Sequence, residues 1–156
     1  MTGHKQTMVA LLRRHKWNTG AELGVDQGLL SVMLLDARPS LTLIGVDNFQ
    51  MFPDRKSDAV AVAERYGPRF RLIEADTHDA AEQIADGSLD FVFIDGTHTE
   101  AATIDDIECW QPKVKPGGYL LGDAYNPSHY PAVVKAVHRF FPKPDVHPGR
   151  VWGVQC

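Results

Sequence analysis

Apolar runs of strand length alternate five times with segments of helical periodicity, and this alternation limits the fold more than any other feature. The runs expected to be strands are 19–25, 41–47, 69–76, 89–95 and 117–123. The segments expected to be helices after them are 27–37, 55–67, 77–84, 99–114 and 131–141. Such an alternation predicts an α/β fold, doubly wound, with a mostly parallel sheet and helices on both faces.

Local signals add detail to this plan. An early helix is expected over 8–14, packed on the sheet or, as the alternative, covering the cofactor or a second copy of the chain in a homodimer. Thr77 is a candidate cap for the helix that follows it. In the helix over 99–114 the apolar stripe is Ala101, Ile104, Ile107 and Trp110, and the side chains expected to face water are Asp105, Asp106 and Glu108. A hairpin is expected across Pro148 and Gly149.

Length and charge narrow the class of protein. The 156 residues are expected to form a single domain, 1–156, and 44% apolar with 23% charged residues excludes a disordered chain. Acidic residues exceed basic ones by four, which argues against an obligate nucleic-acid partner. The sequence has no apolar run of membrane-spanning length, and its two cysteines lack metal-site spacing. We therefore expect a soluble, cytoplasmic protein.

Acidic residues recur where the predicted strands end. In parallel sheets ligands bind outside the carboxyl ends of the strands. Those ends hold Gly24, Asp47, Asp76, Asp95 and Asp123. Four of these five residues are aspartates, so the predicted binding edge of the sheet is acidic.

The turn after the first strand reads Glu22-Leu23-Gly24-Val25-Asp26-Gln27-Gly28. Its two glycines permit close approach of the backbone to a ligand, and the following helix offers free N–H groups. The dinucleotide fingerprint needs a third glycine, and the acids at positions 22 and 26 would repel its pyrophosphate. We expect instead a cofactor with cationic groups, such as S-adenosylmethionine.

Two further aspartates have both a binding and a structural interpretation. Asp47 closes the second strand, at about the sequence spacing after the glycine turn where an acidic side chain can hydrogen-bond the hydroxyls of a ribose. The alternative for an isolated loop carboxylate is that it is solvated or caps a helix. Its position one βαβ unit after the glycine turn favours the ribose. Asp76 and Thr77 can meet an adenine amino group or form a plain helix cap, and the two roles are compatible.

In the order and spacing of these motifs, the chain resembles the class I S-adenosylmethionine-dependent methyltransferases. Within them it is similar to the small methyltransferase domain 24 group, akin to macrocin-type and catechol-type O-methyltransferases. The resemblance is carried by AELGVDQG, LIGVDNF, EADTHDAA, LDFVFIDGTHTEAATIDDIECW and PKVKPGGYLLGDAY, which cover residues 19 to 125 or so. It implies a Rossmann-like seven-stranded sheet of order 3-2-1-4-5-7-6 with the last strand antiparallel.

The resemblance also implies a cofactor site. Its members are Glu22, Gly24, Val25, Asp26 and Gly28 at the first turn, Asp47 and Asn48 at the ribose, Asp76 and Thr77 at the adenine, and Asp95 near the methyl group. Catechol-type relatives bind magnesium, and Asp95 and Asp123 match two of its ligands. Ala124 stands where the third ligand is expected, so methyl transfer without metal is the alternative.

His98 lies three residues after Asp95, at the expected mouth of the site. A neutral imidazole there could take the proton of an attacking hydroxyl, with Asp95 and Asp123 as its catalytic neighbours. The alternative is that His98 fixes the loop or caps the next helix. We therefore expect O-methylation of a small or glycosylated metabolite. The rival hypotheses are a cofactor-binding module or partner subunit without catalysis and, less favoured by the turn, an NAD-dependent oxidoreductase.

Overall fold

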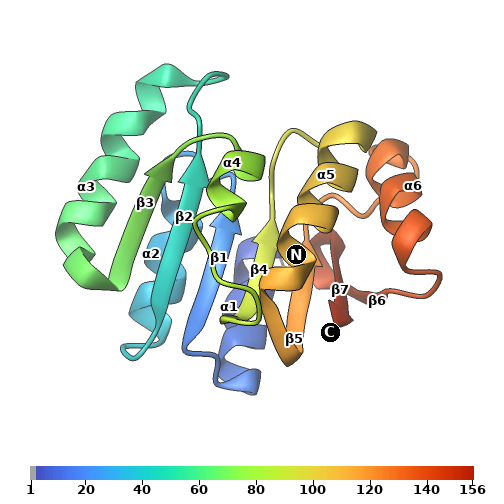
Figure 1. The fold of residues 1–156 in the computed structure, drawn as a ribbon, viewed down its shortest axis with the longest axis horizontal. Coiled ribbons are helices and arrows are strands. Elements are labelled where there is room, and N and C mark those ends of the chain that lie inside the picture. Colours follow the sequence, from blue (N-terminus) through green and yellow to red (C-terminus); the bar gives the residue numbers. More distant parts are fainter. Residues whose placement is uncertain (1–2) are drawn as a thin grey trace.

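The computed structural model describes residues 3–156, and within them seven strands form one sheet of order β3-β2-β1-β4-β5-β7-β6 (Figure 1). The strands are β1 (Thr19–Leu23), β2 (Thr42–Asp47), β3 (Phe70–Glu74), β4 (Leu89–Ile94), β5 (Val114–Gly122), β6 (Asp145–His147) and β7 (Val151–Gln155). β7 runs antiparallel to β5 and β6, and the pairs among β1 to β5 are parallel. The predicted fold class, strand order and antiparallel last strand are confirmed.

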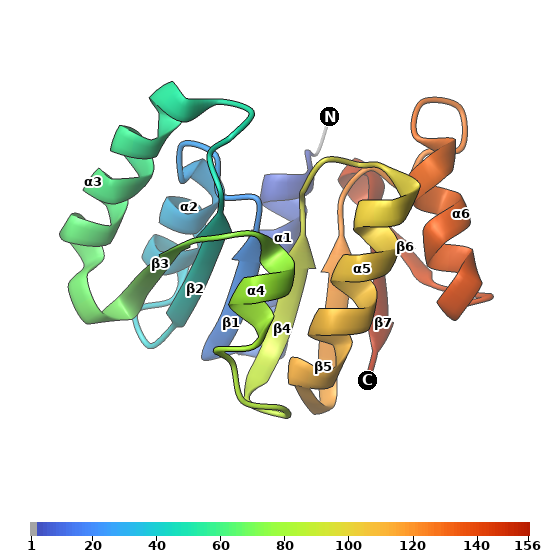
Figure 2. The ribbon, with the colours of Figure 1, turned by 45° about the horizontal axis from the view of Figure 1, so that its top comes forward.

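Helices cover both faces of the sheet. They are α1 (His4–His15), α2 (Leu29–Ala37), α3 (Lys56–Tyr66), α4 (Thr77–Ala81), α5 (Glu100–Trp110) and α6 (Pro131–Phe140). Figure 2 shows α4, α5 and α6 in front of the sheet and α1 and α2 behind it. No helix within residues 3–156 is both long and apolar enough to cross a membrane. The predicted domain 1–156 stays a prediction, and its residues 1 and 2 lie outside the described part.

Two apolar clusters hold these layers together, one on each face. Met8 and Leu12 of α1 are fully buried against Phe91 and Phe93 of β4, so α1 packs on the sheet as expected. On the other face Val92 of β4 lies in one cluster with Trp110 and Trp152. Because β4 contributes side chains to both clusters, its sequence is an unbroken apolar run. The alternative in which α1 covers a second copy of the chain in a homodimer stays a prediction.

The helix predicted over 99–114 is shorter than expected. α5 ends at Trp110, a 3-10 turn follows over Gln111–Lys113, and Val114 already belongs to β5. Pro112 has no N–H to donate and so cannot continue the α-helical hydrogen bonds. The predicted water-facing side of this helix is partly wrong, because Asp106 is buried.

The start of α4 also differs from the prediction. Asp76, not Thr77, is the N-cap residue, and the helix ends at Ala81 rather than Ile84. The Thr77 hydroxyl donates instead to the buried carboxylate of Asp106, which ties α4 to α5. Thr77 thus serves a contact between helices that local sequence cannot reveal.

The turn after β1 lies directly against the chain that follows β4. Leu23 pairs with Ile94, and Asp95 N donates to Leu23 O at 2.8 Å. Gly24 has φ +91°, and a Cβ built on it would lie 2.0 Å from the carbonyl oxygen of Asp95. Only glycine fits this position, and the contact brings the first turn and Asp95 to one place.

The two ends of the described chain meet in a similar way. The predicted hairpin is present as β6 and β7, joined by the turn Pro148–Arg150. The Thr7 hydroxyl donates to Pro148 O at 2.7 Å. Gly149 has φ +73°, and a Cβ there would lie 2.5 Å from the backbone N of His4. This close packing fixes the first turn of α1 beside the ends of β4 and β5.

Candidate active site

A cavity of about 600 Å³ opens at the carboxyl ends of β1 to β4. Eight of the residues predicted for the site line it: Gly24, Asp26, Asp47, Asn48, Asp76, Thr77, Asp95 and His98. The other four, Glu22, Val25, Gly28 and Asp123, lie outside its lining. Val25 is buried, Gly28 caps the start of α2, and Glu22 and Asp123 are buried acids. Most of the predicted set therefore converges on one space.

The Asp47 carboxylate is fixed by backbone donors at the end of β2. Its Oδ2 accepts from Asp26 N at 2.9 Å, and its Oδ1 accepts from Phe49 N at 2.8 Å. Each carboxylate oxygen has further lone pairs, so both can still accept hydrogen bonds from a ligand. The side chain is thus held in one orientation, with acceptor capacity left over.

The charge of the first turn is smaller than its sequence indicates. Burial, opposed by a hydrogen bond from Ser31, raises the pKa of Glu22 to about 8, so its carboxyl group is neutral at pH 7. Asp26 pairs with Arg55 at 2.5 Å, and that guanidinium also covers the ring of Phe52 at 3.9 Å. The cationic Arg55 at the cavity wall is a feature that the sequence reasoning missed.

The end of β3 supplies a second polar wall. Asn48 Nδ2 donates to Asp76 Oδ1 at 2.6 Å, which holds that carboxylate beside the end of β2. The Thr77 carbonyl accepts from Trp110 Nε1 at 3.0 Å. Burial raises the pKa of Asp106 to about 6, while the hydrogen bond from Thr77 opposes this rise. The wall is therefore anchored to the buried face of α5.

A second group of polar side chains lies where β4 and β5 end. His4 Nε2 lies 3.6 Å from Asp95 Oδ2, and His4 Nδ1 lies 3.7 Å from Asp123 Oδ2. Burial first, and the charge of Asp123 second, raise the pKa of Asp95 to about 7. Asp123 is only 6% exposed, and its Oδ1 has no hydrogen-bond partner within residues 3–156.

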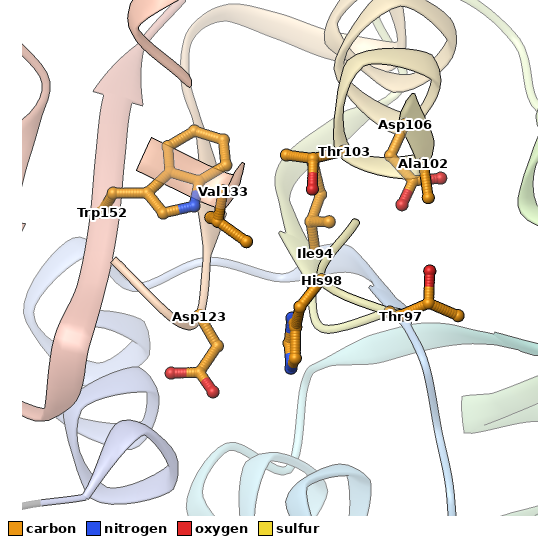
Figure 3. Close-up of a pocket in the computed structure, with 10 residues that line it drawn as sticks. Ile94, Thr97, His98, Ala102, Thr103, Asp106, Asp123, Val133 and Trp152 are labelled. Atoms are coloured by element: carbon orange, nitrogen blue, oxygen red, sulfur yellow. The ribbon is translucent and has the colours of Figure 1, made fainter. Parts of the chain in front are cut away.

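His98 links this group to the cavity. Its Nε2 lies 3.7 Å from Asp95 Oδ1, and Figure 3 shows its ring and the Asp123 carboxylate extending toward the same side of a small pocket. Burial lowers the pKa of His98, which favours the neutral imidazole. The helix cap comes from Thr99, whose hydroxyl accepts from Ala102 N at 3.2 Å, so His98 does not cap α5.

The donors in this group fit a divalent cation. One imidazole nitrogen and two carboxylate oxygens, from His4, Asp95 and Asp123, all lie within 4.8 Å of one another. Asp123 Oδ1, which has no hydrogen-bond partner among the described residues, is a buried acceptor of the kind that a cation satisfies. Ala124 offers no side-chain ligand, as the sequence indicated, and His4 lies in the group instead.

Sequence reasoning did not find His4. A signal was present, because His4 precedes the buried Met8 by four residues and so lies on the same face of α1. What the sequence could not show is that this face ends beside Asp95 and Asp123, about 90 and 120 residues further along the chain.

Comparisons with known proteins agree with this geometry. A family model described as a methyltransferase domain matches residues 21–125. A search of curated proteins finds no match. Among solved structures, a methyltransferase from Podospora anserina bound to S-adenosylhomocysteine has a TM-score of 0.76 at 15% identity, covering 99% of this chain and 79% of that one.

Two further structures are similar in the same degree. A TDP-rhamnose 3′-O-methyltransferase of calicheamicin biosynthesis has a TM-score of 0.72 at 15% identity, covering 97% of this chain and 80% of that one. A 1,6-didemethyltoxoflavin N1-methyltransferase from Burkholderia thailandensis has a TM-score of 0.71 at 14% identity, covering 97% and 77%. At these identities the likeness is one of fold. With the family match over two thirds of its length, the chain belongs to the methyltransferase domain family and is a class I S-adenosylmethionine-dependent methyltransferase.

Proposed function

We propose that the chain transfers the methyl group of S-adenosylmethionine to an oxygen atom of a small or glycosylated metabolite. The observation that carries the proposal is the cavity that runs from the fixed Asp47 carboxylate to Asp95 and His98. The cavity connects the wall at Asp47, which is suited to a nucleoside, with His98, which is suited to proton transfer. The solved relatives include a sugar O-methyltransferase and an N-methyltransferase, and His98 favours an acceptor that must lose a proton.

Asp47 would hold the ribose of the cofactor, and Asp76 and Thr77 would hold its adenine. Asp47 is supported in this role by its two backbone donors, which leave lone pairs for the ribose hydroxyls. Asn48 orients Asp76 toward the same cavity. The first turn would hold the methionine part, and Gly24 would offer it backbone rather than a side chain. Glu22, Val25 and Gly28 support that turn from behind.

At the far end the acceptor hydroxyl meets the methyl group between Asp95 and His98. The acceptor oxygen forms its bond to the methyl carbon as the carbon–sulfur bond breaks, and the sulfur keeps that electron pair. The hydroxyl proton passes to His98 Nε2. A neutral imidazole is needed for this step, and burial of His98 supports it.

Asp95 and Asp123 would hold a divalent cation at this end, and Mg²⁺ is the ion that the sequence resemblance implies. A bound cation would polarise the acceptor oxygen and orient it. The chain's own contribution is a buried carboxylate pair whose mutual repulsion is unrelieved by any hydrogen bond to Asp123 Oδ1 within the described residues.

The proposed location of the protein is the cytoplasm. Cys109 and Cys156, which form no disulfide in the described chain, are compatible with that reducing compartment.

Calorimetric titration of the purified chain with S-adenosylmethionine, S-adenosylhomocysteine and NAD tests the cofactor. Asp47→Ala should weaken S-adenosylmethionine binding by about 1 to 3 kcal/mol, because it removes charge-assisted hydrogen bonds to the ribose. Asp47→Asn keeps one acceptor oxygen and should lose less. The matched control is Asp54→Ala, an exposed aspartate that does not line the cavity.

Three results would count against parts of this proposal. Unchanged affinity in Asp47→Ala would remove the ribose assignment. Tighter binding of NAD than of S-adenosylmethionine would favour an oxidoreductase. Tight binding of S-adenosylmethionine with no methyl transfer to a panel of hydroxylated and glycosylated acceptors would favour a binding module or partner subunit.

A further inference from the structure

We infer that His4 is the third protein ligand of the cation site formed with Asp95 and Asp123, and that it makes the site prefer a first-row transition cation such as Mn²⁺ to Mg²⁺. The inference rests on the proposed function, because it concerns the cation at the methyl-accepting end of that site. What it adds is a ligand from α1 and a choice of metal.

The position of His4 is built into the fold. The turn Pro148–Arg150 leaves so little room that a Cβ on Gly149 would lie 2.5 Å from the His4 backbone N. The hydrogen bond from Thr7 to Pro148 O holds the next turn of α1, and the His4 ring stacks near Phe93 at 6.2 Å between centroids. A histidine held this way presents its ring nitrogens at a fixed place.

That place lies between the two carboxylates. His4 Nε2 lies 3.6 Å from Asp95 Oδ2, and His4 Nδ1 lies 3.7 Å from Asp123 Oδ2. Only one of these nitrogens can bind a given ion, and one ligand atom from each of the three residues lies within 4.8 Å of the other two. Both distances are too long for good hydrogen bonds. They do suit atoms that share one ion, since ligands about 2.1 Å from a metal lie about 3 to 4 Å from each other. The buried, partnerless Oδ1 of Asp123 is a further acceptor in the same cluster.

The other charged groups nearby do not replace a cation. Lys5 Nζ donates to His4 Nε2 at 3.1 Å, and Arg150 approaches Asp123 Oδ2 only to 3.9 Å. Neither contact reaches Asp123 Oδ1. If these two side chains were the intended counter-ions, a direct ion pair at hydrogen-bond distance to Asp95 or Asp123 would be expected.

The types of ligand atom determine which metal ion the site prefers. Mg²⁺ favours an all-oxygen environment with several retained waters, whereas imidazole suits transition cations. One nitrogen and two carboxylates therefore favour Mn²⁺, Co²⁺ or Zn²⁺ over Mg²⁺. Replacing the imidazole by a carboxylate should reverse that preference without emptying the site.

The test is Mn²⁺ binding to the untagged full chain, followed by electron paramagnetic resonance and by pulsed measurement of nitrogen hyperfine coupling. The wild-type chain should bind Mn²⁺ more tightly than Mg²⁺ and show coupling to one imidazole nitrogen. His4→Ala should lose that coupling and weaken Mn²⁺ binding by about 10- to 100-fold. His4→Asp should keep a bound cation without nitrogen coupling and bind Mg²⁺ relatively better.

His78→Ala is the matched control, because His78, Asp105 and Cys109 form the other group of close ligand atoms in the described chain. It should leave the nitrogen coupling unchanged. Three results would overturn the inference: no Mn²⁺ binding by the folded wild-type chain, binding without nitrogen coupling, or coupling that survives in His4→Ala. None of these three results concerns S-adenosylmethionine binding, so each would leave the proposed function intact. Absence of S-adenosylmethionine binding would instead remove the proposed function.

Discussion

Among single residues, His98 has the most direct predicted role, and its backbone makes that role separable from a structural one. Its φ is +59°, a left-handed conformation that is uncommon for residues other than glycine, asparagine and aspartate. The fold therefore holds the ring in place at some cost in backbone energy. Such strain at a cavity wall is common where a side chain must be aimed at a ligand.

We predict that His98→Ala lowers kcat by about 100-fold or more, because no group then accepts the acceptor's proton. The affinity for S-adenosylmethionine should change little, since the proposed cofactor contacts are at Asp47 and Asp76. Steady-state kinetics and calorimetry measure the two quantities separately. His98→Asn tolerates the left-handed backbone but cannot act as the base, so recovery of activity in that variant would show that the histidine only shapes the loop.

At the level of elements, the join between β1 and β4 organises the site. Both strands end at the cavity, and Gly24 allows the turn after β1 to touch the backbone of Asp95. A side chain at position 24 would push apart the turn after β1 and the backbone of Asp95. The glycine therefore has a packing role in addition to any contact with the cofactor.

Gly24→Ala should destabilise the chain more than a glycine substitution of equal backbone strain. Gly87 provides the comparison, because its φ is +61° and nothing lies within 4 Å of a Cβ built there. Gly87→Ala should lose about 1 to 2 kcal/mol from backbone strain alone. Gly24→Ala should lose about 1 to 3 kcal/mol more from the clash with Asp95. Urea unfolding measures both, and equal losses would contradict the packing role.

The elements also show where sequence reasoning succeeds and fails. Five strands and their helices were predicted because their periodicity is local, and the resemblance supplied the strand order. The errors have long-range causes. Asp106 is buried because its partner Thr77 comes from another helix, 29 residues earlier in the chain. His4 was missed because its neighbours Asp95 and Asp123 meet it only through the sheet.

For the whole molecule, stability should depend on pH through the buried Glu22. Burial raises its folded pKa from 4.5 to about 8. Between these values the unfolded chain has released this proton while the folded chain still holds it. The free energy of unfolding contributed by this group therefore falls as pH rises from about 4.5 to about 8. Each unit of pKa difference corresponds to about 1.4 kcal/mol.

Glu22→Gln removes this titration while keeping an oxygen that accepts from Ser31. From pH 5 to pH 8, roughly the interval between the two pKa values, the unfolding free energy should fall by up to a few kcal/mol less in Glu22→Gln than in the wild type. Chemical unfolding at several pH values measures the slope. Glu108→Gln, an exposed glutamate on α5, should leave it unchanged. The same slope in wild type and Glu22→Gln would show that Glu22 is ionised in the folded chain.

The contact between α1 and the turn Pro148–Arg150 has a consequence for how the protein is made. Thr7 and Pro148 are 141 residues apart. At a synthesis rate of about 5 to 20 residues per second, the ribosome needs roughly 7 to 30 seconds to supply the second partner after the first. Throughout that interval the contact that fixes the first turn of α1 beside Asp95 and Asp123 is missing. The proposed cation site would therefore be completed only after the turn Pro148–Arg150 has been synthesised.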